Sequence, residues 1–173
     1  MRLREADGSS ASVGLLVSIL VRYPEICTIS YVPESRTLGF SFMVSRRVEA
    51  AEIQAFKHKA LTSIRVYLGL LKAPGEPVLH ITGSYVGDIT QIQLTRDVAT
   101  LTADEISLLI GLILAGFSDN LITDRSEDFE EEDLVVQDEF IANLLADLKE
   151  SVQDKGLIGF REEGRVVVFN KTA

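Results

Sequence analysis

One long amphipathic stretch, from Val48 to Lys72, limits the folds that are open to this chain. Its apolar side chains recur every three or four residues, which is the spacing of one face of an α-helix. The members of this face are Ile53, Phe56, Ala60, Ile64, Tyr67 and Leu71. Ser45 is expected to cap the start of the helix, and Pro74 to end it. A helix of this length spans about 36 Å. It is therefore predicted to lie across a whole β-sheet.

A pair of predicted strands stands on each side of this helix. Apolar and polar residues alternate between Ile26 and Ser45 and again between Val78 and Val98, and each stretch contains a turn. A first helix is predicted from Ser10 to Arg22, where it ends before Pro24. The sequence therefore predicts an α+β fold, in which two β-hairpins form an antiparallel sheet that packs on the long helix.

A third predicted helix, from Thr102 to Phe117, contains an apolar run from Ile106 to Phe117 and is hydrophobic on nearly all sides. Thr102 with Glu105 three residues later forms a capping box, which marks the start of this helix. A helix with so little polar surface is expected either deep in the core or at a contact between subunits. Its main stripe is therefore the predicted interface: Ile106, Leu109, Ile110, Ile113, Leu114 and Phe117.

The predicted core domain ends at residue 117, and much of the segment that follows is strongly acidic. Residues 100–155 carry three Lys/Arg against fifteen Asp/Glu, whereas residues 1–99 carry eleven against nine. The sequence predicts a core domain over residues 10–117, an acidic linker over 118–136, and a C-terminal extension over 137–170 with one helix and a third hairpin around Gly164. So much negative charge repels phosphate backbones, so nucleic acid is not an expected partner.

No catalytic, cofactor-binding or metal-binding residue is predicted. The histidines, His58 and His80, and the single cysteine, Cys27, do not stand at the spacing of zinc ligands. The acidic linker offers carboxylates to a divalent cation, but a solvated loop is the preferred interpretation. One cysteine allows no intrachain disulfide, and the apolar run from Val13 to Val21 is too short to span a bilayer. We expect a soluble, cytoplasmic protein with no cofactor and no membrane contact.

The order of predicted elements over residues 10–117 resembles the type III secretion chaperone-like fold, which sensory-transduction-regulator proteins share. The segments that carry this resemblance are Leu38–Val44, Ile53–Leu71, Val78–Ile81 and Thr102–Phe117. The resemblance implies a small acidic homodimer that binds extended segments of client proteins. It transfers no binding residue, because none of these segments is a signature motif.

Three functions are compatible with the sequence. The leading hypothesis is a non-enzymatic, chaperone-like or regulatory protein-interaction module that acts as a homodimer. The first alternative is a nucleic-acid-binding or transcription-associated protein that uses the C-terminal helix and hairpin like a winged helix. The second is a small-molecule sensor or an enzyme, with its site between the sheet and the helix after Thr102.

Overall fold

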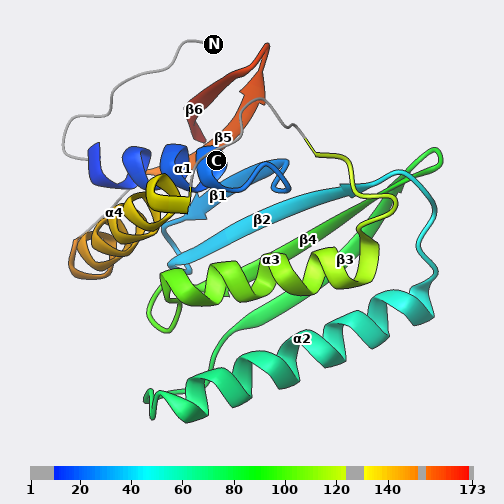
Figure 1. Ribbon diagram of the computed structural model, residues 1–173, viewed down its shortest axis with the longest axis horizontal. Coiled ribbons are helices and arrows are strands. Elements are labelled where there is room, and N and C mark those ends of the chain that lie inside the picture. Colours follow the sequence, from blue (N-terminus) through cyan, green and yellow to red (C-terminus); the bar gives the residue numbers. More distant parts are fainter. Residues whose placement is uncertain (1–9, 124–130, 152–154, 172–173) are drawn as a thin grey trace.

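The computed structural model describes residues 10–123, 131–151 and 155–171. Helices and strands alternate along the chain in the order that the sequence predicts (Figure 1). Their bounds are α1 Ser10–Arg22, β1 Thr28–Val32, β2 Thr37–Val44, α2 Ala50–Leu70, β3 Leu79–Val86, β4 Ile89–Asp97, α3 Ala103–Phe117, α4 Glu131–Glu150, β5 Gly156–Glu162 and β6 Arg165–Lys171.

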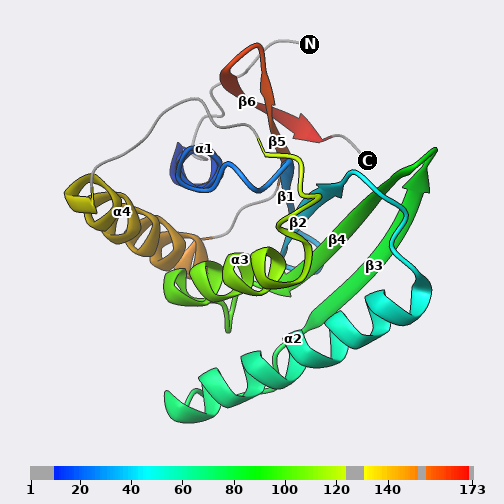
Figure 2. The ribbon, with the colours of Figure 1, turned by 45° about the vertical axis from the view of Figure 1, so that its right-hand side comes forward.

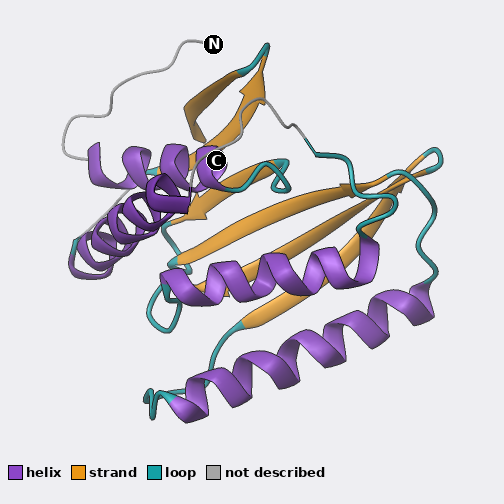
Figure 3. Ribbon diagram, viewed as in Figure 1, coloured by secondary structure: helices purple, strands orange, loops and turns teal. Residues whose placement is uncertain are grey.

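All six described strands belong to one antiparallel sheet, in the order β3-β4-β2-β1-β5-β6 (Figure 3). The predicted α+β class is therefore confirmed. The third hairpin, β5–β6, extends the same sheet because β5 pairs with β1 from Thr28↔Phe160 to Tyr31↔Leu157. The hairpin that the winged-helix alternative requires as a free wing is thus a pair of strands inside the sheet.

Helices α1, α2 and α3 cover one face of the sheet, and α4 packs on α1 (Figures 1 and 2). The side chains of β4 show the consequence. Ile92 and Leu94 on the covered face are buried, whereas the neighbouring Gln91 and Gln93 on the other face are partly exposed. Gly83 in β3 lets α2 approach closely, because a Cβ there would lie 2.3 Å from the Ile53 side chain. The period of two in the sequence therefore reports a sheet with one covered face.

Two helix starts differ from the sequence prediction. Glu49, not Ser45, is the N-cap residue of α2, and its side chain makes no capping hydrogen bond. Ser45 is held elsewhere, because its backbone N–H and its hydroxyl both donate to the carbonyl of Asn120. Helix α4 begins at Glu131 rather than Gln137, inside the predicted acidic linker. Negative side chains in a first turn stabilise a helix, which explains the earlier start.

No helix in the described part of the chain has the combination of length and apolarity that is needed to cross a membrane.

The phenol of Tyr31 is a polar group buried without a hydrogen bond. Its side chain is 1% exposed, and its hydroxyl has no partner among the described residues. Burial raises the pKa of this phenol. Because an unsatisfied buried hydroxyl costs about 1–3 kcal/mol, Tyr31→Phe is expected to leave the free energy of unfolding unchanged or to raise it, as measured by urea denaturation.

Tyr23→Phe is the matched control. Tyr23 is also buried, but its hydroxyl is hydrogen-bonded to the Ser107 side chain. Loss of that bond is expected to destabilise the protein by about 1 kcal/mol. A larger loss for Tyr31→Phe than for Tyr23→Phe would contradict the assignment of Tyr31 as unsatisfied.

Candidate interaction surface

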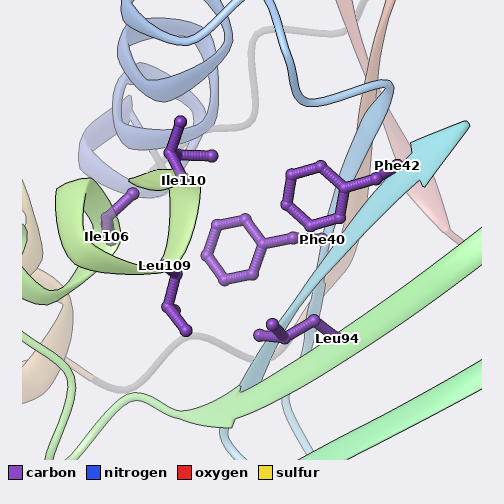
Figure 4. A pocket seen from close by; sticks show the side chains of 6 residues that line it. All are labelled: Phe40, Phe42, Leu94, Ile106, Leu109 and Ile110. Carbon is purple, nitrogen blue, oxygen red and sulfur yellow. The ribbon is translucent and has the colours of Figure 1, made fainter. Parts of the chain in front are cut away.

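The apolar stripe that the sequence predicts as an interface faces the chain's own sheet. Ile106, Leu109 and Ile110 of α3 point toward Phe40 and Phe42 of β2 and toward Leu94 of β4 (Figure 4). These six side chains fill the space so completely that no water molecule fits between them. Ile113 and Phe117 are buried as well, whereas Leu114 is partly exposed. Five of the six predicted interface residues are thus already covered by this chain.

The opposite face of α3 is also without charge. No ionisable side chain occurs from Ile106 to Phe117. The residues on this outer face are either exposed or partly buried: Ser107, Leu108, Gly111, Leu112, Ala115 and Gly116. A solvent-facing helix in a globular protein normally carries charged residues on that side. The outer face of α3, defined by these six residues, is therefore the surface on which we expect a protein partner to bind.

Gly111 stands in the middle of this outer face. A Cβ built there meets no atom within 4 Å, so packing inside the chain does not require a glycine. Glycine inside a helix costs about 0.5–1 kcal/mol relative to alanine. With Ala115 one turn later, it leaves the helix backbone open to close approach from outside.

A shallow apolar groove of about 180 Å³ lies beside this face, between α2 and α3. It is lined by Glu52, Ala55, Phe56, Lys59, Leu112, Gly116 and Phe117. The rings of Phe56 and Phe117 meet in its floor, with centroids 5.4 Å apart. Polar side chains stand at its rim, so the groove combines an apolar floor with a charged border, as protein-binding surfaces do.

Arg46 fixes one end of the groove. Its guanidinium donates two hydrogen bonds to the Glu52 carboxylate, at 2.8 and 2.7 Å, and lies over the ring of Phe117. A third donor, Nε, reaches Asn120 Oδ1 at 3.0 Å. The hydrogen bonds from Arg46 lower the pKa of the Glu52 carboxyl. This arrangement ties the start of α2 to the end of α3 beside the groove.

A buried ion pair fixes the other end of α3. Arg96 of β4 and Glu105 are both fully buried, and two hydrogen bonds of 2.6 Å join them. Thr102 caps α3 as predicted, because its hydroxyl accepts from the Glu105 N–H at 3.1 Å. The Glu105 carboxylate, however, binds Arg96 instead of completing the capping box. This pair was not predicted from the sequence, although Arg96 falls on the inward side of the alternation that includes Ile92 and Leu94.

The residues considered for chemistry stay apart. His58 on α2 and His80 on β3 are exposed, and Cys27 is an exposed residue just before β1. Cys27 falls in the alternating stretch that begins at Ile26 and was predicted to form a strand, but β1 begins only at Thr28, so that boundary was wrong. The described residues contain no group of His, Cys, Asp and Glu that could hold a metal ion. Residues 124–130 of the acidic linker, for which a solvated loop was preferred over a cation site, lie outside the described residues.

A second groove, of about 540 Å³, opens at the ends of β1, β2 and β5. Its lining is mostly apolar: Pro24, Ile26, Cys27, Thr28, Met43, Ile122, Thr123, Phe160 and Arg161. The Arg161 guanidinium donates to the carbonyls of Leu20, Tyr23 and Ile26, and so closes the C-terminal end of α1. Neither histidine lines this groove, so it does not bring a base to the Cys27 thiol.

Comparison with known proteins gives no functional assignment for this chain. No protein-family model matches the chain, and neither the curated proteins nor the solved structures contain a match. Function is therefore argued from the surfaces that the fold presents.

Proposed function

We propose that this chain is a non-enzymatic protein-interaction module that acts as a homodimer through the outer face of α3. The observation that carries the proposal is the absence of any ionisable side chain from Ile106 to Phe117, on a helix whose outer face is uncovered. A contact between subunits would bury this face and leave the groove between α2 and α3 at its border.

Charge favours a second copy as the occupant of the outer face of α3. The chain has a net charge of −9, so two copies repel each other over most orientations. They meet without that repulsion only where both surfaces are uncharged. In a contact with two-fold symmetry, both copies contribute the same face. Small residues such as Gly111 and Ala115 allow the two helices to approach closely.

The expected resemblance to type III secretion chaperone-like proteins is compatible with this proposal. The order of elements over residues 10–117 agrees with it, and such proteins form acidic homodimers that bind client segments. Client binding by this chain, and a chaperone-like or regulatory role, are proposed on the same basis. Within such a dimer, the part of the groove lined by Ala55 and Lys59 of α2 stays at the border of the contact, where it is open to a client side chain.

A charge placed on the outer face of α3 tests the proposal. Gly111→Glu puts a carboxylate at the centre of this face, and its Cβ has free space in the single chain. Because two like charges would meet in a water-poor contact, the dissociation constant of the dimer is expected to rise by about 100-fold or more. Sedimentation equilibrium measures this constant, and circular dichroism checks that the fold is retained.

Gly69→Glu is the control for that measurement. Gly69 is also an exposed helical glycine with no atom within 4 Å of a built Cβ, but it lies in the last turn of α2. The same chemical change there is expected to leave the dimer intact. Dissociation by Gly69→Glu and not by Gly111→Glu would move the contact to the end of α2, where Val66 and Leu70 are exposed, and would refute the proposal.

A further inference from the structure

We infer that the free edge of β6 binds an extended polypeptide segment with an apolar centre and acidic ends, by adding it to the sheet as a further strand. This site is independent of the proposed dimer contact. It lies at the end of the sheet formed by the C-terminal hairpin, whereas the outer face of α3 belongs to the helical layer (Figure 2).

The sheet order leaves one side of β6 without a partner strand. β6 pairs with β5 continuously, from Gly156↔Lys171 to Glu162↔Arg165, and no other strand of the described residues pairs with it. Its seven residues therefore present a row of backbone N–H and C=O groups to any strand that approaches.

β6 lacks three of the features that block pairing at a sheet edge, namely proline, an inward-pointing charge and a β-bulge. Its charged residues, Arg165 and Lys171, stand only at its two ends. The central residues of β6 are Val166, Val167, Val168 and Phe169, all of which favour strands, and the register with β5 is unbroken. An incoming strand would therefore find a straight and regular template.

The side chains beside this edge favour apolar residues in the incoming strand. Val168 and Gly159 face α1, because a Cβ at Gly159 would touch both Leu20 and Val168. Val167, which is partly exposed, and Phe169, which is buried, therefore point to the opposite face. There Phe169 packs against Phe160, with ring centroids 5.5 Å apart. Alternate residues of an added strand would extend this apolar patch.

Charge at the two ends of β6 selects the partner. Arg165 and Lys171, which begin and end the strand, are both exposed. If two copies paired through β6 about its centre, Arg165 of each would stand opposite Lys171 of the other. Like charges that face each other across strands are destabilising. A second copy is therefore disfavoured, and a segment with Asp or Glu at both ends fits.

The test uses the full chain and a short synthetic peptide of about nine residues, a usual strand length. The peptide alternates valine and threonine, ends in two glutamates on each side and carries a fluorescent label. Fluorescence anisotropy is expected to show saturable binding of this peptide. Weaker binding is expected for a peptide with lysines in place of the glutamates, and none for the acidic peptide with alternate backbone nitrogens methylated, because methylation removes the pairing N–H groups.

A double charge reversal, Arg165→Glu with Lys171→Glu, is expected to weaken binding of the acidic peptide by about tenfold, since each exposed cross-strand ion pair contributes modestly. Arg65→Glu with Lys72→Glu makes the same change in net charge on exposed residues of another surface and is expected to have no effect. The inference is overturned if the acidic peptide does not bind, if it binds no better than the basic one, or if methylation leaves binding unchanged.

Discussion

Arg96→Met is expected to lower the free energy of unfolding by about 3–5 kcal/mol, the largest effect among single substitutions that we anticipate. Arg96 and Glu105 are both fully buried and are joined by two hydrogen bonds of 2.6 Å. Removal of the guanidinium leaves the Glu105 carboxylate buried and unpaired at the start of α3. Urea denaturation followed by circular dichroism measures the loss.

The double variant Arg96→Met with Glu105→Leu separates two contributions to the free energy of unfolding: that of the ion pair itself, and the cost of leaving one buried charge unpaired. It is expected to be more stable than either single variant, because an apolar pair of similar volume can replace a buried ion pair at little cost. The Arg96 guanidinium also donates to the carbonyl of Val78 at 3.1 Å, so recovery to the full stability of the parent chain is not expected. Additive losses in the double variant would contradict this account.

Ile113→Ala is expected to lower the free energy of unfolding by about 2–5 kcal/mol, the usual range for an emptied core position. Ile113 is fully buried on the inner side of α3. Its truncation should leave the association of the remaining folded protein unchanged, since the outer face is untouched. Stability is measured by urea denaturation, and association by sedimentation equilibrium on the same sample.

Leu112→Ala provides the contrast within the same helix. Leu112 is partly exposed and lines the groove beside α2. A smaller loss of stability is expected from Leu112→Ala than from Ile113→Ala, together with weaker association. If Ile113→Ala instead abolished association with little loss of stability, the inner stripe would be the interface, as the sequence alone suggested.

The sequence predicted the positions of helices and strands along the chain better than it predicted which strands pair. Amphipathic spacing located α2 to within two residues at each end, and turn residues such as Gly87 and Gly164 located two hairpins. The pairing of β1 with β5 could not be predicted. It joins residues far apart in the chain, and strand periodicity specifies which face is buried but not which strand lies alongside.

The predicted interface shows a second limit. On α3 every side is apolar or small, so periodicity identifies a stripe but cannot tell whether this chain or another one covers it. Ile106 and Leu109 proved to face the chain's own sheet, which leaves Gly111 and Leu112 on the outer side. The role of Arg96 was not predicted, because a charged residue at an inward position is rare unless a buried partner exists, and the capping box had already assigned its partner, Glu105, another role.

In the proposed homodimer, the uncharged outer face of α3 joins two copies of the chain. Sedimentation equilibrium of the unmodified protein over a range of micromolar concentrations is the direct test of this contact. We expect a mass of about twice the 19.0 kDa of one chain, and we expect the mass of Gly111→Glu at the same concentrations to fall toward that of one chain. A mass of 19.0 kDa for the unmodified protein at the highest concentration would contradict it.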